Sequence, residues 1–92
     1  MTSEDILKKA LDTFGGENQI DKLKEELVEL SKALTKYQEC GDIAKHHVIE
    51  EIVDVRLVIT QVLWYIEAGD DVVEWSKAKL KRLERLVIDE TE

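Results

Sequence analysis

Apolar residues recur along the chain at the three- and four-residue steps that are typical of amphipathic helices. The pattern predicts helices over about residues 3–13, 17–39, 43–68 and 72–87. No stretch shows the alternation of a β-strand, and no internal repeat or low-complexity segment separates one part from another. We therefore expect an all-α fold in which residues 1–92 form a single domain, an antiparallel bundle of about four helices.

Capping and stop residues mark the expected helix ends. Thr2 or Ser3 is placed to cap the first helix, and Asp42 is placed to cap the third. The glycines of the chain all lie between apolar segments, where they are expected to end helices: Gly15, Gly16, Gly41 and Gly69.

The third predicted helix is apolar on almost every side beyond Val48. A helix of that kind is expected to be central and buried. A chain of 92 residues buries a smaller fraction of its surface than a larger domain does. We therefore expect that assembly with further copies completes the bundle.

The formal net charge of −8 argues against a nucleic-acid partner, because such a surface repels phosphate backbones. A phosphorylated ligand remains compatible with this charge if a divalent cation lies between the two. The most apolar run, residues 52–66, contains Asp54 and Arg56 and is short for a membrane span. The lone Cys40 and an N-terminus without signal-peptide features favour a cytoplasmic protein.

Two acidic motifs lie on neighbouring predicted helices. The second helix carries Glu25, Glu26 and Glu29, and the third carries Glu51 and Asp54. Within each motif, acids three residues apart share a helix face. Glu29 and Glu51 are equidistant from residue 40 at the turn, and so are Glu26 and Asp54. In an antiparallel hairpin all four acids would lie at about the same height, on the order of 16 Å from the turn, between helices about 8–10 Å apart.

Carboxylates brought together in this way repel one another and lose hydration, so some must be protonated or a cation must lie among them. Oxygen ligands favour a hard cation, Mg²⁺ before Ca²⁺ or Mn²⁺, and protein-bound Mg²⁺ usually contacts phosphate as well. An isolated acidic pair is usually a solvated face, and only Glu26 of its motif borders the apolar stripe. Glu51 and Asp54 lie on an apolar helix, where a buried acid needs a partner.

These motifs, EExxE at residues 25–29 and ExxD at residues 51–54, resemble the signature of the all-α nucleotide pyrophosphohydrolases, which include MazG proteins. The flanking segments also resemble short MazG-like proteins: Gly16 and Gln19 before the first motif, residues 24–30 and 50–55 around the two motifs, and the basic residues 79–83. The resemblance covers about residues 14–86.

The resemblance implies Mg²⁺-dependent hydrolysis of a nucleoside triphosphate to a monophosphate and pyrophosphate, with Mn²⁺ as a possible substitute. It also implies a homodimer or homotetramer whose cleft is completed by a neighbour. Carried over by position, the metal ligands would be Glu26, Glu29, Glu51 and Asp54. Glu25 would orient a water or act as a base, and Lys79 and Arg82 would bind the substrate phosphates.

Two other functions remain open. A helical interaction or regulatory module would use the apolar helices to bind a partner, and its acids would serve solubility. A relative that binds nucleotide or metal without turnover would keep the same acids. His46 and His47 lack convincing ligand spacing, and Trp64, Tyr65 and Trp75 fit core or interface positions better than a base-stacking platform. The sequence does not indicate which base the substrate carries.

Overall fold

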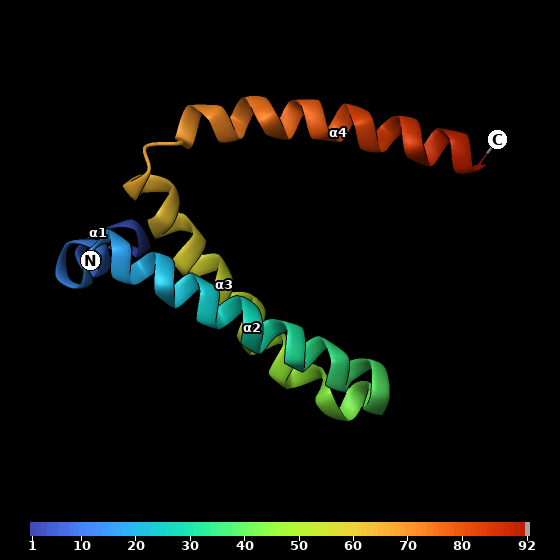
Figure 1. Ribbon diagram of the computed structural model, residues 1–92, viewed down its shortest axis with the longest axis horizontal. Helices are drawn as coiled ribbons and strands as arrows, with labels where there is room; N and C mark the ends of the chain where they lie inside the picture. Colours follow the sequence, from blue (N-terminus) through green and yellow to red (C-terminus); the bar gives the residue numbers. More distant parts are fainter. Residues whose placement is uncertain (92) are drawn as a thin grey trace.

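The computed structural model describes residues 1–91, and almost all of them are helical (Figure 1). The elements are α1 (Ser3–Phe14), α2 (Gly16–Cys40), the short 3-10 helix η1 (Gly41–Ala44), α3 (Lys45–Tyr65) and α4 (Gly69–Thr91). Within the described residues there is no strand. The all-α prediction is therefore confirmed.

The first helix begins where its capping residues predict. Thr2 Oγ1 accepts a hydrogen bond from the Asp5 amide at 3.0 Å, and Asp5 Oδ2 accepts one from the Thr2 amide at 3.0 Å. This reciprocal capping box satisfies two amides that the helix itself leaves unpaired. The helix ends at Gly15, whose φ of +87° suits glycine and whose amide donates to the Leu11 carbonyl at 2.8 Å.

Several other helix ends differ from the sequence prediction. Gly16 is the first residue of α2 and not a stop, and η1 occupies the turn before α3. Asp42 makes no side-chain capping hydrogen bond there. Helix α3 ends at Tyr65, before Glu67 with its φ of +53°, and Gly69 begins α4. A left-handed residue that is not glycine interrupts the helix ladder, which is why α3 is shorter than its apolar pattern predicts.

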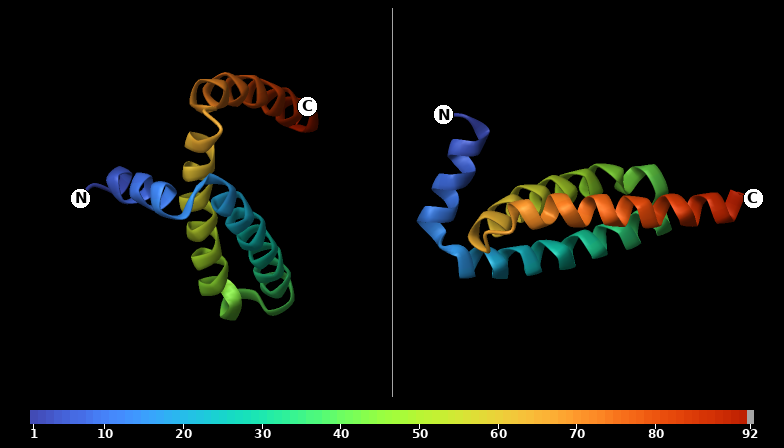
Figure 2. Two further views of the ribbon diagram at one scale, coloured as in Figure 1. Left: turned by 60° about the vertical axis from the view of Figure 1, so that its left-hand side comes forward. Right: turned by 90° about the horizontal axis from the view of Figure 1, so that it is seen from above.

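Helices α2 and α3 form an antiparallel hairpin, and α1 lies across the end at which α2 begins (Figure 2). Three apolar residues are buried within the described chain: Ala33, Val55 and Val58. A buried polar pair lies nearer to α1, where Gln19 Nε2 donates to Gln61 Oε1 at 2.6 Å. The hairpin therefore has a narrow core, part apolar and part polar.

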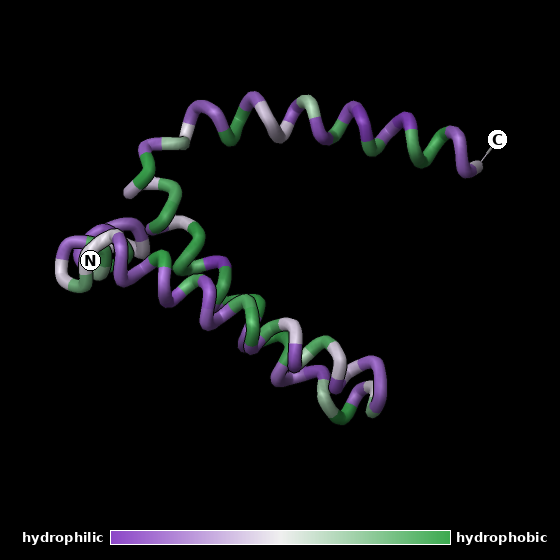
Figure 3. The backbone as a smooth tube through the Cα atoms, in the orientation of Figure 1, coloured by the Kyte–Doolittle hydropathy of each residue, from purple (hydrophilic) through white to green (hydrophobic). Residues whose placement is uncertain are grey.

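The expectation that α3 is buried on all sides is wrong for the single chain. Four of its apolar residues have 41–48% of their surface exposed: Ile49, Ile52, Val53 and Leu57. The hydropathy colouring in Figure 3 is green over much of α3. Within residues 1–91 its main neighbours are α2 and α1, which leave part of a helix that is apolar all round uncovered. Among residues 1–91, no helix combines the length and the apolar character needed to cross a membrane.

Helix α4 leaves the end of α3 and runs apart from the hairpin (Figure 1). All of its residues are exposed except Val72, which is half-buried. The Cα radius of gyration is 16.5 Å, whereas a compact domain of this length is expected near about 12 Å. A closed four-helix bundle is therefore not formed within one chain.

Candidate metal centre

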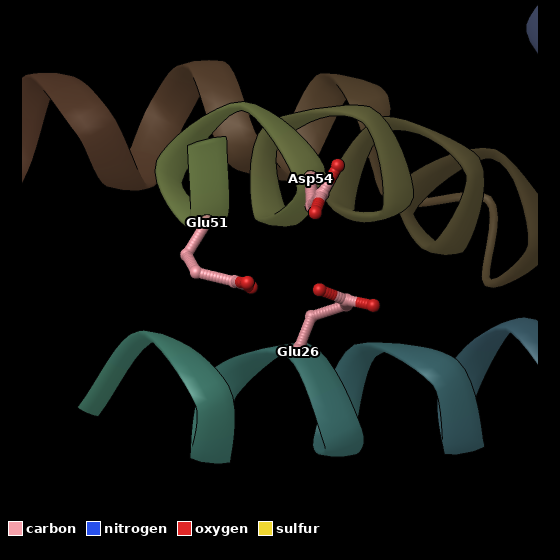
Figure 4. Close-up of side chains that lie close together, drawn as sticks. All are labelled: Glu26, Glu51 and Asp54. Carbon is pink, nitrogen blue, oxygen red and sulfur yellow. The ribbon is translucent and has the colours of Figure 1, made fainter. Parts of the chain in front are cut away.

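The three carboxylates of Glu26, Glu51 and Asp54 form a cluster between α2 and α3, with one ligand oxygen from each within 4.8 Å of the others. Figure 4 shows that Glu26 reaches up from α2 and Glu51 down from α3, while the carboxyl group of Asp54 lies beside α3 above Glu26. These three residues are called the acidic cluster below. It unites acids that are distant in sequence and come from both predicted motifs.

The position of each acid follows from helical periodicity. On α2 the residues Gln19, Glu26 and Ala33 recur every seven residues, which is close to two turns, so they share the face toward α3. Gln19 and Ala33 are buried, and the Glu26 side chain between them is 12% exposed. On α3 the three-residue step from Glu51 to Asp54 keeps both acids beside that face.

One cation of the chain already lies at the cluster. Lys22 Nζ is 3.0 Å from Glu26 Oε1, one turn earlier on α2. The hydrogen bond to Glu26, followed by the charge of that carboxylate, raises the pKa of Lys22. Lys22 thus offsets part of the negative charge, but it pairs with one carboxylate of the three.

Glu51 is the least satisfied member of the cluster. Its Oε2 atom is closed off from solvent and has no hydrogen-bond partner within residues 1–91. Burial raises the pKa of Glu51, and the proximity of Glu26 and the charges of Glu26 and Asp54 raise it further, while His47 acts in the opposite direction. This oxygen is shielded, has no donor and lies next to two further carboxylates. A bound cation would contact it and offset the repulsion among the three carboxylates.

The donor set fits a hard divalent cation. All ligand atoms are carboxylate oxygens, which Mg²⁺ and Mn²⁺ accept and which softer metals do not favour. Three carboxylates would leave other positions around such an ion to water and to phosphate oxygens. Glu26, Glu51 and Asp54 are therefore the residues that would hold such an ion.

Glu29 does not join the cluster, although the motif register places it level with Glu51. Its carboxylate instead lies 3.6 Å from Lys32 Nζ, and half of its side chain is exposed. Relative to Glu26 it is rotated by about 60° around α2, and Glu25 by about 100°. Equal spacing from residue 40 fixes the height of the acids along the helices, but this rotation decides which acids face α3.

The remaining predicted residues lie at different distances from the cluster. Glu25 lines a hollow of about 560 Å³ that Lys22 also lines, so it borders the site without facing its centre. Lys79 and Arg82 lie on α4, which contributes nothing to the hollows around the cluster. The Lys79 ammonium lies 5.9 Å from the centre of the Trp75 ring on its own helix.

The contact between Gln19 and Gln61 is a buried polar contact of the hairpin that was not predicted from the sequence. Gln19 and Gln61 are each twenty-one residues from residue 40, so the register that relates the acidic motifs also pairs these two glutamines. Gln19 is 8% exposed and Gln61 is 4% exposed. Extending the register beyond the acids would have revealed them.

Comparison of this chain with known protein families, with curated proteins and with solved structures found no match in any of the three. Any function therefore has to be argued from the acidic cluster and its surroundings.

Proposed function

We propose that this protein is a Mg²⁺-dependent nucleotide pyrophosphohydrolase, which converts a nucleoside triphosphate and water into a monophosphate and pyrophosphate. The observation that carries the proposal is the convergence of Glu26, Glu51 and Asp54 within 4.8 Å, with one oxygen of Glu51 shielded and unpartnered. A helical adaptor has no need of such an arrangement. The resemblance of the two acidic motifs to MazG-like proteins supplies the reaction class.

The acidic cluster would hold the ion, with Glu29 as a fourth ligand after rotation of its exposed side chain. When bound, Mg²⁺ neutralises charge on phosphate oxygens and makes a nearby water more acidic; Mn²⁺ is the expected substitute. In the reaction the water oxygen bonds to the α-phosphorus, and the bond from that phosphorus to the bridging oxygen breaks. Glu25, at the border of the site, accepts the proton of the water as pyrophosphate leaves.

The phosphate-binding role of Lys79 and Arg82 requires a second copy of the chain, since α4 lies apart from its own acidic cluster. We propose a homodimer or homotetramer in which these residues face the cluster of a neighbour. The extended shape and the exposed apolar side chains of α3 support association. The proposal thus includes this assembly, and it also includes the cytoplasmic location expected from the sequence.

A second candidate is a helical interaction module. It is favoured by α4, which exposes Trp75, Leu80, Leu83 and Leu86 to solvent along a free-standing helix. Such a helix could bind a groove on another protein through its apolar face. In that case, or in a relative that binds nucleotide without turnover, the acidic cluster would have no hydrolytic role.

The deciding experiment measures pyrophosphate release from a panel of ribo- and deoxyribonucleoside triphosphates, with Mg²⁺ and with EDTA. Wild type is compared with Glu51→Gln and with the control Glu50→Gln, whose exposed carboxylate contacts His47 outside the cluster. Mg²⁺-dependent release that is lost in Glu51→Gln and kept in Glu50→Gln supports the hydrolase. No release from any nucleotide by folded wild-type protein would favour the interaction module.

A further inference from the structure

Two adjoining hollows lie beside the acidic cluster, on the side toward α1. The larger, of about 560 Å³, reaches Glu25, and the smaller, of about 310 Å³, reaches Glu26 and Asp54. Both are lined by Phe14, Gln19, Lys22 and Val58. These four residues are common to both, so the two hollows adjoin, and together they are called the α1 groove below.

A relay of hydrogen bonds fixes the orientation of Gln19 in the wall of this groove. Gln61 Nε2 donates to the backbone carbonyl of Leu57 at 3.2 Å, and a carbonyl can only accept. The other end of the Gln61 amide must therefore present its oxygen, which accepts from Gln19 Nε2 at 2.6 Å. The amide of Gln19 is thus held with its nitrogen toward α3 and cannot turn over without breaking the relay.

This relay leaves Gln19 Oε1 as a fixed acceptor. Within residues 1–91 it has no hydrogen-bond partner, and it is not sealed from solvent, although the residue as a whole is only 8% exposed. A polar side chain that is more than nine-tenths buried usually has its acceptor satisfied. A free acceptor in the wall of a groove is a position for a ligand donor.

The groove also offers an aromatic surface. Phe14 ends α1, lines both hollows and is 58% exposed, so its ring is available to a ligand. Aromatic rings stack on every nucleobase, since each base has a π-face. Gln19 precedes Glu26 by seven residues on the same face of α2, or about 10 Å along the helix, comparable with the span of a nucleoside and its first phosphate.

We infer that the α1 groove binds the base of the nucleotide, with Phe14 stacking on the ring and Gln19 Oε1 accepting a hydrogen bond from an N–H of the base. The identification of the ligand as a nucleotide rests on the proposed function. Gln61 is a positioning residue, because it holds Gln19 as an acceptor without touching the base itself. The groove would therefore reject a base whose N–H at that edge has been replaced by a methyl group.

The test titrates the full chain with nucleosides and nucleoside monophosphates, without metal, and follows backbone amide signals by NMR. Uridine is compared with 3-methyluridine, and adenosine with N6,N6-dimethyladenosine. The variants are Gln19→Met, Gln61→Met and the control Gln38→Met, which alters an exposed glutamine of the same helix. Circular dichroism establishes that each variant is folded, and if Gln19→Met is not, Gln61→Met and the methylated nucleosides carry the comparison.

We expect the wild type and Gln38→Met to prefer at least one unmethylated base over its methylated analogue by about five- to tenfold, the worth of one hydrogen bond. Gln19→Met should lose that preference. Gln61→Met should reduce that preference, because the freed amide of Gln19 can present its nitrogen to the base instead. A merely structural role of Gln61 would not change the base preference. Phe14→Leu should weaken the binding of all bases by a similar factor.

Hydrolysis and base binding can fail separately. Mg²⁺-dependent turnover with equal rates for all bases and for inorganic tripolyphosphate, and no change in Gln19→Met, would overturn the base site and leave the hydrolase. Base binding that depends on Gln19 without any hydrolysis would support the groove and overturn the enzyme. No binding of any nucleoside or monophosphate by folded wild-type protein would overturn the inference.

Discussion

The ring of Tyr65 packs directly on Gly16, where a Cβ atom at residue 16 would overlap the ring carbons. The contact joins the first residue of α2 to the last residue of α3 at the end of the hairpin that carries the α1 groove. Gly16→Ala should therefore destabilise the protein by about 1–3 kcal/mol, because the ring has to leave its packed position. Urea unfolding followed by circular dichroism measures this change.

The control for that prediction is Gly69→Ala. A Cβ atom there would meet no atom within 4 Å, and the residue opens the exposed helix α4. The free energy of unfolding of Gly69→Ala should stay within about 0.5 kcal/mol of the wild-type value. Equal unfolding midpoints for both variants would show that the Gly16–Tyr65 contact does not contribute to stability.

Adding Mg²⁺ should stabilise the folded chain against heat. At a concentration one hundred times the dissociation constant, mass action contributes about 2.7 kcal/mol. Glu51→Gln should remove most of this stabilisation, since Glu51 supplies the shielded oxygen of the cluster. Thermal melts with Mg²⁺ and with EDTA measure the difference.

The variant Glu29→Gln tests whether the metal is held by the three residues of the acidic cluster or equally by all four acids of the motifs. Glu29 lies outside the acidic cluster and contacts Lys32, so its loss should reduce the Mg²⁺ effect less than the loss of Glu51 does. The control Glu50→Gln should keep the full effect. If Glu29→Gln abolishes the rise in melting temperature caused by Mg²⁺ while Glu51→Gln retains it, the acidic cluster is not the Mg²⁺ site.

The metal-free protein should lose stability as the pH rises through the raised pKa of Glu51. The ordinary value is 4.5, so above it the folded chain keeps a proton that the unfolded chain has released. The stabilisation is complete below pH 4.5 and disappears above the folded pKa, whereas Mg²⁺ affinity rises over the same interval because binding expels that proton.

Asp5 affects the pH dependence of stability in the opposite direction to Glu51, and at lower pH. Its capping hydrogen bonds to Thr2 lower its pKa from the ordinary 3.8, so its contribution is present above that value and lost in stronger acid. Urea unfolding of wild type and Glu51→Gln across this pH range separates the two effects. If the two proteins show the same slope above pH 4.5, the Glu51 assignment is wrong.

Glu17 should control the ionisation of Tyr65. The Tyr65 hydroxyl donates to Glu17 Oε1 at 3.1 Å, and this hydrogen bond, followed by the charge of the carboxylate, raises the pKa of the tyrosine above its ordinary 10.0. In a Tyr37→Phe background, ultraviolet titration reports Tyr65 alone. The midpoint should fall toward 10.0 in Glu17→Gln, and an unchanged midpoint would exclude the contact in solution.

Helix α4 should be only marginally stable in the isolated chain. Its residues are exposed apart from Val72, and a helix without tertiary packing is weakly populated in water. In dilute protein its amides should exchange with solvent much faster than that of buried Val55. If copies associate as proposed, exchange in α4 should slow at high protein concentration; strong protection at the lowest concentration would contradict this description.

The hairpin and most of the cluster followed from the sequence. Apolar periodicity located four helices, and equal spacing from residue 40 placed Glu26 level with Asp54. Both inferences use regular helix geometry, which hardly depends on distant parts of the chain. The cap of the first helix was narrowed to Thr2 or Ser3 for the same reason, and the structure shows Thr2, whose partner Asp5 lies within the next turn.

The parts that could not be predicted depend on choices between packing arrangements. Whether Glu29 faces α3 is decided by the rotation of α2, which Gly16 and Tyr65 help to set through close contact. The direction of α4 is decided around Glu67, where a left-handed residue turns the chain away from the hairpin. Neither choice leaves a periodic signal in the sequence.

Cys40 ends α2 and is exposed at the tip of the hairpin, about 21 Å along the helix from Glu26. As the single thiol of the chain, it gives one attachment point for a spin label or fluorophore that leaves the acidic cluster untouched. Label-to-label distances in an assembly would then report how the copies are arranged. The same thiol can join two copies through a disulfide under air, so association should be measured in a reducing buffer, where a covalent pair cannot imitate a native one.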